Sequence, residues 1–194
     1  MMWASGIVSS LLVCTLLCCL WDTASGWKLY LGTCTVSVHT HELRHHFHEI
    51  RQSVLARDRQ LGVKLLRRDM MKNVQDTERC CFLRHLLRFY VERVFSCYAA
   101  TQSQHRRTIN VLANAFLSIK RDLRVCHEQN HCPCGEETRM EFSAIQAKFE
   151  KLEQKAAAVK AVAELDSLLE WLDAIHHRKE QILEEDDKSH PENP

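Results

Sequence analysis

The chain has 194 residues, of which 45% are hydrophobic and 26% are charged, and its formal net charge is +1. Its 26 Lys and Arg residues nearly balance 25 Asp and Glu residues, so the basic excess typical of a nucleic-acid-binding protein is absent from the sequence. With five glycines and three prolines, the sequence leaves little room for a turn-dense β architecture and favours one helical domain.

The chain begins with the pattern of a secretory leader. An apolar run at residues 7–21 is too short to span a bilayer with its flanks, and the small residues Ala24, Ser25 and Gly26 follow it. We therefore predict that residues 1–26 are a signal peptide. No later segment approaches the roughly 20 apolar residues of a membrane span, so we expect a soluble protein that is secreted and extracellular.

The first predicted helix covers residues 40–57. Leu43, Phe47, Ile50 and Val54 recur there at spacings of three and four, which lines one face of a helix. The stretch that follows has mixed periodicity, and we expect a loop with a short helix.

A second predicted helix begins at Asp76 or Thr77, either of which suits an N-cap, and runs for about six turns. Its apolar positions are Leu83, Leu86, Leu87, Tyr90, Val94 and Tyr98. Cys97 lies at the edge of this apolar face. We therefore predict that Cys97 is the unpaired cysteine, buried and inert, with an intermolecular disulfide as the alternative.

Thr101 and Gln104 resemble a capping box ahead of a third predicted helix. The apolar face of this helix is marked by Ile109, Leu112, Phe116 and Leu123. Lys120 falls inside that face. A lysine in this position usually extends along its own stem to water, or it reaches a carboxylate on a packed neighbour, for which Glu164 and Asp166 are candidates.

Two further helices are predicted before an acidic tail. Glu136 and Glu137 suit the positive end of a helix, whose apolar positions are Phe142, Ile145, Phe149 and Leu152. Residues 156–177 spread apolar side chains over an arc of about 140°, so we expect one central helix there. Residues 184–194 are acidic and offer nothing to bury, and we predict a disordered tail. The helical domain then covers residues 27–183.

Seven of the ten cysteines follow the leader, which indicates three disulfides and one unpaired thiol in an oxidising compartment. Cys80 and Cys81 are adjacent, and a disulfide between neighbours would strain the peptide. Each is therefore expected to pair with Cys132 or Cys134. Cys34 is then left to pair with the cysteine at position 126.

One motif suggests a metalloenzyme. His41, Glu42 and His45 spell the H-E-x-x-H pattern of zinc proteases. With Leu43 at the centre of the apolar face, both histidines project away from the core, and the third ligand of the metzincin pattern is missing. We therefore expect a solvated helical face. The alternatives are a secreted zinc-dependent hydrolase, adventitious zinc, or a protonation-sensitive binding face that includes His48.

A second set of potential metal ligands surrounds the loop after the third helix. Cys132 and Cys134 are separated by one residue, and His127 and His131 lie nearby. Behind a signal peptide we expect disulfides at these cysteines instead. The sequence therefore predicts no metal, no cofactor and no enzymatic activity.

Several long motifs carry a family resemblance. CCFLRHLLRFYVERVF at residues 80–95 and KAVAELDSLLEW at residues 160–171 are similar to signature segments of the interleukin-10 family of helical cytokines. CPCGEE at residues 132–137 and LANAFLSIKRDLRVC at residues 112–126 resemble its interleukin-19/interleukin-20 subgroup more closely. LRRDMMKNVQDTERCCFLRHLLR, at residues 66–88, leans toward interleukin-20 members.

This resemblance covers nearly all of residues 30–175 and implies an all-α, compact bundle of six to seven amphipathic helices stapled by disulfides. It implies a monomer that bridges two class 2 cytokine receptor chains of the interleukin-20 receptor type. Signalling through Janus kinases and STAT proteins in epithelial or immune-related cells would follow. The implied disulfides are Cys34–Cys126, Cys80–Cys132 and Cys81–Cys134. The chain departs from the family pattern at Cys97, at Ala163 and in the longer tail beyond His176.

By the same resemblance, one receptor chain contacts residues 40–57, the connection after them and residues 156–177. The other chain contacts a neighbouring face that involves residues 40–57 and the third helix. From exposure and position, the predicted receptor-binding residues are Arg44, His48, Arg51, Lys64, Arg67, Arg68, Arg106 and Arg107. The alternative for each is a solvated charge that contributes little. A helical lipid-binding module, which would need an exposed apolar groove, is the remaining alternative function.

Overall fold

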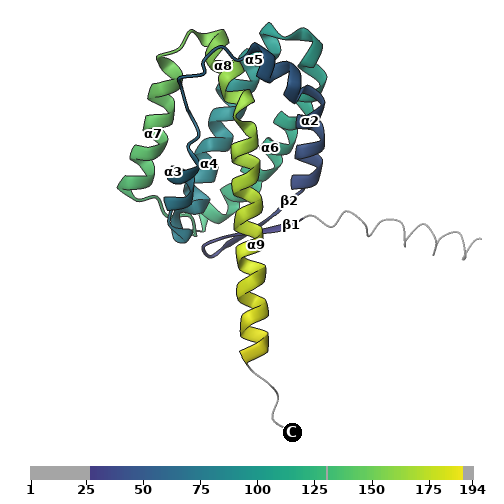
Figure 1. Ribbon diagram of the computed structural model, residues 1–194. Helices are drawn as coiled ribbons and strands as arrows, with labels where there is room; N and C mark the ends of the chain where they lie inside the picture. The colour runs from purple at the N-terminus through teal and green to yellow at the C-terminus, as the bar shows by residue number, and fades with distance from the viewer. Residues whose placement is uncertain (1–26, 130, 190–194) are drawn as a thin grey trace, which may run out of the picture.

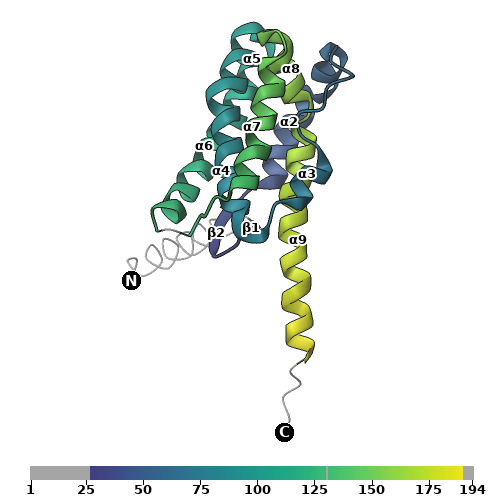
Figure 2. The same cartoon turned by 90° about the vertical axis from the view of Figure 1, so that its left-hand side faces the viewer.

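The computed structural model describes residues 27–129 and 131–189, with side chains as far as residue 177. The fold is the predicted all-α bundle, and one continuous hydrophobic core lies between the helices (Figures 1 and 2). The last helix, α9 (Leu165–Ser189), crosses the front of the bundle in Figure 1 and extends beyond its end. Among the described residues, no helix combines the length and the apolarity that a membrane span requires. The predicted signal peptide lies outside the described residues.

A β-hairpin, which the helical prediction did not include, precedes the first helix. Strands β1 (Trp27–Leu31) and β2 (Cys34–Val38) are antiparallel, with Leu31 opposite Cys34. Gly32 opens their two-residue connection with a φ of 71°, the positive φ that such tight turns require and that glycine adopts without strain. Alternate residues of β2 are buried, so one face of the hairpin closes the end of the core.

The first helix forms where its periodicity predicted. Helix α2 (Thr40–Arg57) buries Leu43, Phe47, Ile50 and Val54 against the core. The short helix expected in the following connection is α3 (Arg68–Asn73). Because the apolar residues of α2 form one narrow stripe, the two flanks of the helix remain accessible on either side of it.

The second predicted helix is longer and less regular than expected. It consists of η1 (Asp76–Glu78), α4 (Arg79–Phe89), the π turn η2 (Tyr90–Phe95) and α5 (Ser96–Thr101). The N-cap prediction is wrong, because neither Asp76 nor Thr77 makes a side-chain cap hydrogen bond at the start of η1 or α4. The carboxylate of Asp76 forms an ion pair with Arg79 instead.

The π turn brings two aromatic residues into the core together. Because π turns are closed by hydrogen bonds five residues apart, Tyr90 and Phe95 both face inward, and both contact Phe116. The hydroxyl of Tyr90 donates to the carbonyl of Ala161 at 2.9 Å. Burial raises the pKa of the Tyr90 phenol far above its ordinary value, so the side chain stays neutral.

The third predicted helix is α6 (Arg106–Glu128), and its apolar face is the predicted one. The predicted capping box is wrong. Thr101 remains in the last turn of α5, where its hydroxyl donates back to the carbonyls of Cys97 and Tyr98. A separate turn, η3 (Ser103–His105), then leads into α6.

Lys120 does reach a carboxylate on a packed neighbour, but the predicted partners are wrong. Its Nζ lies 3.0 Å from Oε1 of Glu92, on the π turn. Asp166 pairs with Arg51 instead, and Glu164 pairs with Lys160. Sequence periodicity placed Lys120 on the correct face of α6, but it did not specify which helix packs there.

The single helix predicted for residues 156–177 is divided into two. After α7 (Glu136–Glu150), the chain forms α8 (Gln154–Ala163) and then α9, with a break at Glu164. At the break Glu164 has φ −92° and ψ 7°, and its side chain points toward the connection between α2 and α3. Neither glycine nor proline marks this position, so the break depends on tertiary contacts.

The C-terminal helix continues into the segment predicted to be disordered. Residues 184–189 belong to α9, which ends at Ser189. This stretch contains residues that helices tolerate, and the first proline of the tail comes only at Pro191. Residues 190–194 lie outside the described residues.

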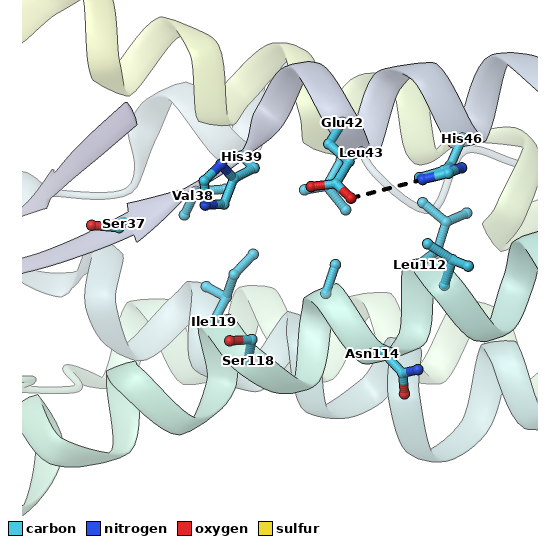
Figure 3. A pocket seen from close by; sticks show the side chains of 12 residues that line it. Ser37, Val38, His39, Glu42, Leu43, His46, Leu112, Asn114, Ser118 and Ile119 are labelled. Atoms are coloured by element: carbon cyan, nitrogen blue, oxygen red, sulfur yellow. Dashed lines mark ion pairs between the residues drawn. The ribbon is translucent and has the colours of Figure 1, made fainter. Parts of the chain in front are cut away.

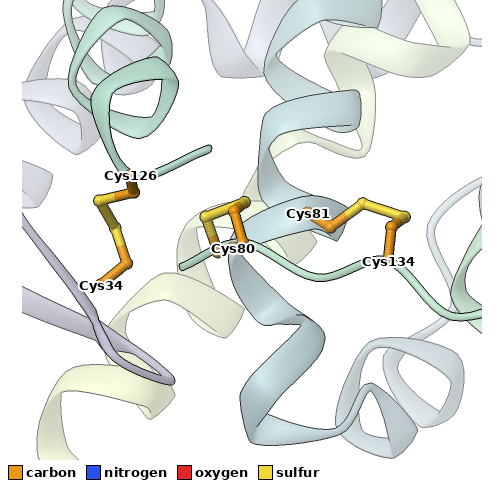
Figure 4. The surroundings of a disulfide bond; sticks show 6 residues. Cys34, Cys80, Cys81, Cys126 and Cys134 are labelled. Atoms are coloured by element: carbon orange, nitrogen blue, oxygen red, sulfur yellow. A yellow bond between two sulfur atoms is a disulfide. The ribbon is translucent and has the colours of Figure 1, made fainter. Parts of the chain in front are cut away.

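Three disulfides fasten the bundle at one end (Figure 4). They are Cys34–Cys126, Cys80–Cys132 and Cys81–Cys134, the pairs that the family resemblance implies. The first joins the hairpin to the end of α6. The other two join the start of α4 to the connection between α6 and α7.

Cys97 carries the one free thiol of the described residues. It is half-buried rather than buried, because it lies at the edge of the apolar face and not inside it. Its Sγ lies 3.6 Å from the carbonyl oxygen of Gln154. Burial raises the pKa of the Cys97 thiol, which disfavours the reactive thiolate.

Candidate functional site

The H-E-x-x-H motif lies on the solvent side of α2. His41, Glu42 and His45 are exposed, whereas Leu43 between them is buried. The His45 Nε2 lies 3.9 Å from a carboxylate oxygen of Glu49, one turn further along the same helix. The two histidines therefore occupy a solvated face, where they line an open hollow and not an enclosed cavity.

Within the described residues, one group of three side chains brings potential metal-ligating atoms within 4.8 Å of one another. It consists of Cys81, His85 and Cys134. Because Cys81 and Cys134 are joined by a disulfide, neither offers a thiolate to a metal. His127 and His131, the other predicted candidates in this region, are exposed.

One flank of α2 meets α9 through a row of ion pairs. Asp166, Glu170 and Asp173 recur on α9 at spacings of four and three, which places their carboxylates on one stripe. Arg51 Nε donates to Asp166 at 2.6 Å, and Arg44 pairs with Asp173. On α3, Arg68 lies 2.8 Å from Glu170. These arginines, predicted as receptor contacts, are therefore already paired within the molecule.

A hollow of about 380 Å³ opens beside this row. It is lined by Arg44, His48 and Arg51 of α2 together with Asp166, and both histidines of the motif, His41 and His45, line it as well. Three of the predicted receptor-binding residues thus converge on one concave surface. The side chain of His48 is exposed at its edge.

The connection between α2 and α3, together with the first residue of α3, holds the next group of predicted residues. Lys64, Arg67 and Arg68 are all exposed. Arg67 Nη2 lies 2.6 Å from Asp69. The hydrogen bond that Arg67 donates lowers the pKa of the Asp69 carboxyl. The Lys64 carbonyl accepts a hydrogen bond from Lys148 at 3.3 Å.

A buried ionic group, which we call the Lys160 group, anchors this connection. Lys160 is 6% exposed, and its Nζ lies 3.0 Å from Asp58 and 3.2 Å from Glu164. The other oxygen of Glu164 accepts the backbone N–H groups of Leu65 and Leu66 at 2.9 and 2.7 Å. Burial alone would lower the pKa of Lys160, but its two carboxylate partners outweigh burial and raise it. The segment that carries Lys64, Arg67 and Arg68 is therefore tied to the α8–α9 junction.

The opposite flank of α2 borders a second hollow, of about 300 Å³, between β2, α2 and α6 (Figure 3). Its α2 side presents His39, Glu42 and His46, and Figure 3 shows the last two facing each other. The His46 Nε2 lies 3.9 Å from Glu42 and its Nδ1 lies 3.7 Å from Glu49. The floor is apolar, formed by Leu43, Leu112, Ala115 and Ile119.

The sequence prediction missed this second hollow. Glu42 was considered only as part of the H-E-x-x-H motif and His46 was not considered, although their spacing of four places them on one flank of α2. Asn114 and Ser118, which line the hollow from α6, are at the same spacing. What could not be read from the sequence is that α6 packs beside this flank.

Arg106 and Arg107, the remaining predicted residues, begin α6 and are exposed. Their neighbour Thr108 donates from its hydroxyl to Glu49 of α2 at 3.0 Å. The start of α6 therefore adjoins the flank of α2 that carries Glu49. The predicted residues consequently divide between the two flanks and do not form one patch.

Comparisons with known proteins agree with this architecture. The family model described as Interleukin 10 matches residues 27–177. Mouse (Mus musculus) interleukin-20 is 43% identical over 158 residues, which cover 80% of this chain and 90% of that protein. Human (Homo sapiens) interleukin-19 is 33% identical over 147 residues, which cover 75% of this chain and 83% of that protein. A solved structure of an edited human interleukin 24 matches with a TM-score of 0.66 and 35% identity, over 76% of this chain and 97% of that one.

Proposed function

This chain belongs to the interleukin-10 family, in the subgroup of interleukins 19, 20 and 24, and we propose that it is a secreted ligand that bridges two class 2 cytokine receptor chains. Bridging would start Janus kinase and STAT signalling in epithelial or immune-related cells that carry both chains. The relatives are interleukins, which are cytokines and not enzymes, so the zinc-hydrolase alternative is wrong.

The observation that carries the proposal is the position of α2 between two hollows. One flank of the helix presents Arg44, His48 and Arg51 beside α9, and the other presents Glu42 and His46 beside α6. A single rigid helix with two accessible flanks suits a ligand that must contact two partners at once. Each partner would then meet α2 together with a different second helix.

The chemistry of the two hollows differs, and this supports two different partners. The hollow beside α9 is bordered by paired arginines and aspartates, whereas the one beside α6 has an apolar floor under a polar rim. Interfaces take most of their affinity from a few residues that become fully desolvated. The apolar floor of the hollow beside α6, where Val111 and Ala115 stay partly exposed, can accept such an anchor from the partner. The row of ion pairs is better suited to orienting a charged partner.

The connection between α2 and α3 extends the first of these surfaces. The Lys160 group holds its backbone in place, so Lys64 and Arg67 are presented on an ordered segment. A partner that binds a preorganised segment loses less conformational entropy than one that must order a loop. We propose that receptor chains of the interleukin-20 receptor type bind here, and that one monomer of this protein is sufficient.

The direct test is STAT phosphorylation in cells that express defined pairs of class 2 receptor chains. The proposal expects a response that requires both chains of one pair and is lost when either is omitted. A response from a single chain, or none from any pair, would contradict bridging.

Substitutions on the two flanks test the geometry separately. Asn114→Arg places a bulky positive charge at the α6 side of the hollow beside α6. His48→Glu places a negative charge at the edge of the hollow beside α9. Each is expected to weaken binding to one purified receptor ectodomain by about tenfold or more while leaving the other unchanged. Ala144→Arg, the same kind of change on an exposed position of α7, is the matched control. Equal losses for both ectodomains in either flank variant would oppose the proposal.

A further inference from the structure

A third concave surface lies on another side of the molecule. It is a groove of about 510 Å³ between α7 and the continuous helix formed by α4 and η2. In Figure 2, α4 and α7 face the viewer while α9 lies at the side, so this groove is separate from the row of ion pairs between α2 and α9. None of the residues assigned above to the two flanks of α2 lines it.

The groove combines cationic walls with an aromatic floor. Arg88, Arg93 and Arg139 line it from three elements. The ring of Phe142 lies 6.3 Å from that of Phe89 and 5.0 Å from that of His85, centroid to centroid. Such a surface offers guanidinium donors around the edge of an apolar patch.

The acidic residues near the groove do not neutralise it. Glu92 is the only carboxylate among the residues that line it, and Arg88 and Lys120 share it. Arg93 pairs with Glu150, and Arg139 has no ion pair among the described residues. Exposed pairs of this kind contribute little energy, so an incoming anion can replace them.

His85 reports the positive potential of the groove. Burial is the first cause that lowers its pKa, and the charges of Arg84, Arg88, Arg139 and His127 lower it further. These groups reach the ring from α4, α7 and α6, while Glu92 is the acidic residue that faces the groove from the π turn. Three arginines acting on one side chain indicate an excess of positive charge at this place.

We infer that the groove between α4 and α7 is a second binding site, and that it takes a linear sulfated polysaccharide of the cell surface or matrix. Guanidinium groups bind sulfate oxygens through paired N–H donors, which favours Arg88, Arg93 and Arg139 over lysines for this ligand. The faces of sugar rings are apolar and pack on aromatic side chains such as Phe142. Because the cations lie on both walls of a groove, one chain with several sulfates contacts more of them than a single anion does.

A membrane surface fits this groove less well. The aromatic floor is recessed, with Phe89 buried, so a flat bilayer would meet only the outer guanidinium groups. A polysaccharide is narrow and flexible enough to enter. The site would hold the cytokine near cell surfaces while both flanks of α2 remain accessible.

Binding of the secreted chain to heparin oligosaccharides of defined length, measured by calorimetry, tests the inference. The double variant Arg88→Gln/Arg139→Gln is expected to bind at least on the order of tenfold more weakly and to show a shallower dependence of affinity on salt. Arg106→Gln/Arg107→Gln removes the same charge from exposed positions at the head of α6 and is expected to bind like the parent. The NMR titration of His85 adds a local readout, because a bound sulfate should raise its pKa in the parent.

Four outcomes would overturn the inference. They are equal weakening in both double variants, an unchanged His85 titration on heparin binding, and competition by inorganic sulfate at the same total sulfate concentration. The fourth is binding to phosphatidylserine vesicles, with the same variant dependence and without heparin binding, which would identify a membrane site instead. Circular dichroism of each variant separates loss of binding from loss of fold.

Discussion

The Lys160 group places charged side chains in a core that is otherwise largely apolar. Lys160 and Glu164 are 6% and 4% exposed, so both give up hydration, which their mutual contact, Asp58 and the backbone N–H groups of Leu65 and Leu66 replace. Such a group adds little net stability compared with apolar residues, yet removing one member leaves its partners uncompensated. Its main effect is to determine where the connection after α2 lies, through the backbone of Leu65 and Leu66.

Lys160→Met is therefore expected to lower the free energy of unfolding by about 3 kcal/mol or more, because two buried carboxylates lose their cation. Denaturant unfolding followed by circular dichroism measures this. Lys120→Met is the control, since Lys120 pairs with Glu92 at the surface and its loss should cost under about 1 kcal/mol. Equal costs for the two variants would show that the Lys160 group is not energetically special.

His105 gives the molecule a pH dependence that can be assigned to one residue. It is buried, with its Nδ1 2.7 Å from the hydroxyl of Tyr98. Burial first, and then the charge of Arg57, lowers the pKa of His105. The unfolded chain thus binds this proton more readily than the folded one, so His105 stabilises the fold above the ordinary histidine pKa and loses that effect as pH falls through the folded value.

His105→Gln is accordingly expected to reduce the drop in melting temperature between about pH 7 and about pH 5. His48→Gln, at an exposed position of α2, should leave that drop unchanged. Melting curves of the three proteins at both pH values decide the matter. A larger drop in His105→Gln than in the parent would reverse the assigned sign.

Among the elements, the hairpin depends most on covalent support. Two short strands are marginal in water by themselves, and here Cys34 at the start of β2 is bonded to Cys126 at the end of α6, 92 residues away. The core-facing side chains of the hairpin, among them Leu29 and Val36, are almost fully buried. The disulfide and this apolar face together hold the hairpin over the end of the bundle.

Replacing both Cys34 and Cys126 by serine is expected to destabilise the protein by about 4 kcal/mol, because the loop that the bond closes is long. Amide hydrogen exchange should quicken first in residues 27–38, and thermal unfolding gives the total. Cys97→Ser, which removes a thiol outside the disulfides, is expected to leave both measurements nearly unchanged. Uniform acceleration of exchange over all helices would indicate a global rather than a local role.

The regular helices were predictable because their residues carry the information themselves. The stripe of α2 from Leu43 to Val54 fixed its bounds and its buried face. The hairpin was missed although alternation in β2 and the glycine before it provide a strand signal. The break at Glu164 and the π turn at Tyr90 could not be predicted, because each is stabilised by a partner that is distant in sequence: the Leu65 backbone for the first and the Ala161 carbonyl for the second.

For the whole molecule, the sequence identified the surface elements that matter but not how they combine. Exposure of His48 and Lys64 followed from helical phase and position. The pairing of Arg44 with Asp173 did not, since it depends on α2 and α9 packing side by side. The hollow beside α6 and the groove between α4 and α7 could not be predicted for the same reason. Each lies between helices that become neighbours only in the folded chain.

The three concave surfaces allow different ligands to bind at different places on the molecule. Two of them share α2, and the third lies on the side formed by α4 and α7. A ligand held through the third surface would therefore still present both flanks of α2. Retention at the cell surface and receptor assembly can then occur on one molecule at the same time.

The adjacent cysteines at the start of α4 also affect how the protein can be produced. Cys80 and Cys81 are neighbours, and their partners Cys132 and Cys134 are two positions apart, so the crossed pairing differs from the native one by a small exchange. Only the formed helix, which points the two side chains in different directions, distinguishes the pairs. Oxidation of an unfolded, bacterially expressed chain would consequently yield a mixture of isomers, and a thiol-shuffling catalyst or a redox buffer would be needed to recover one species.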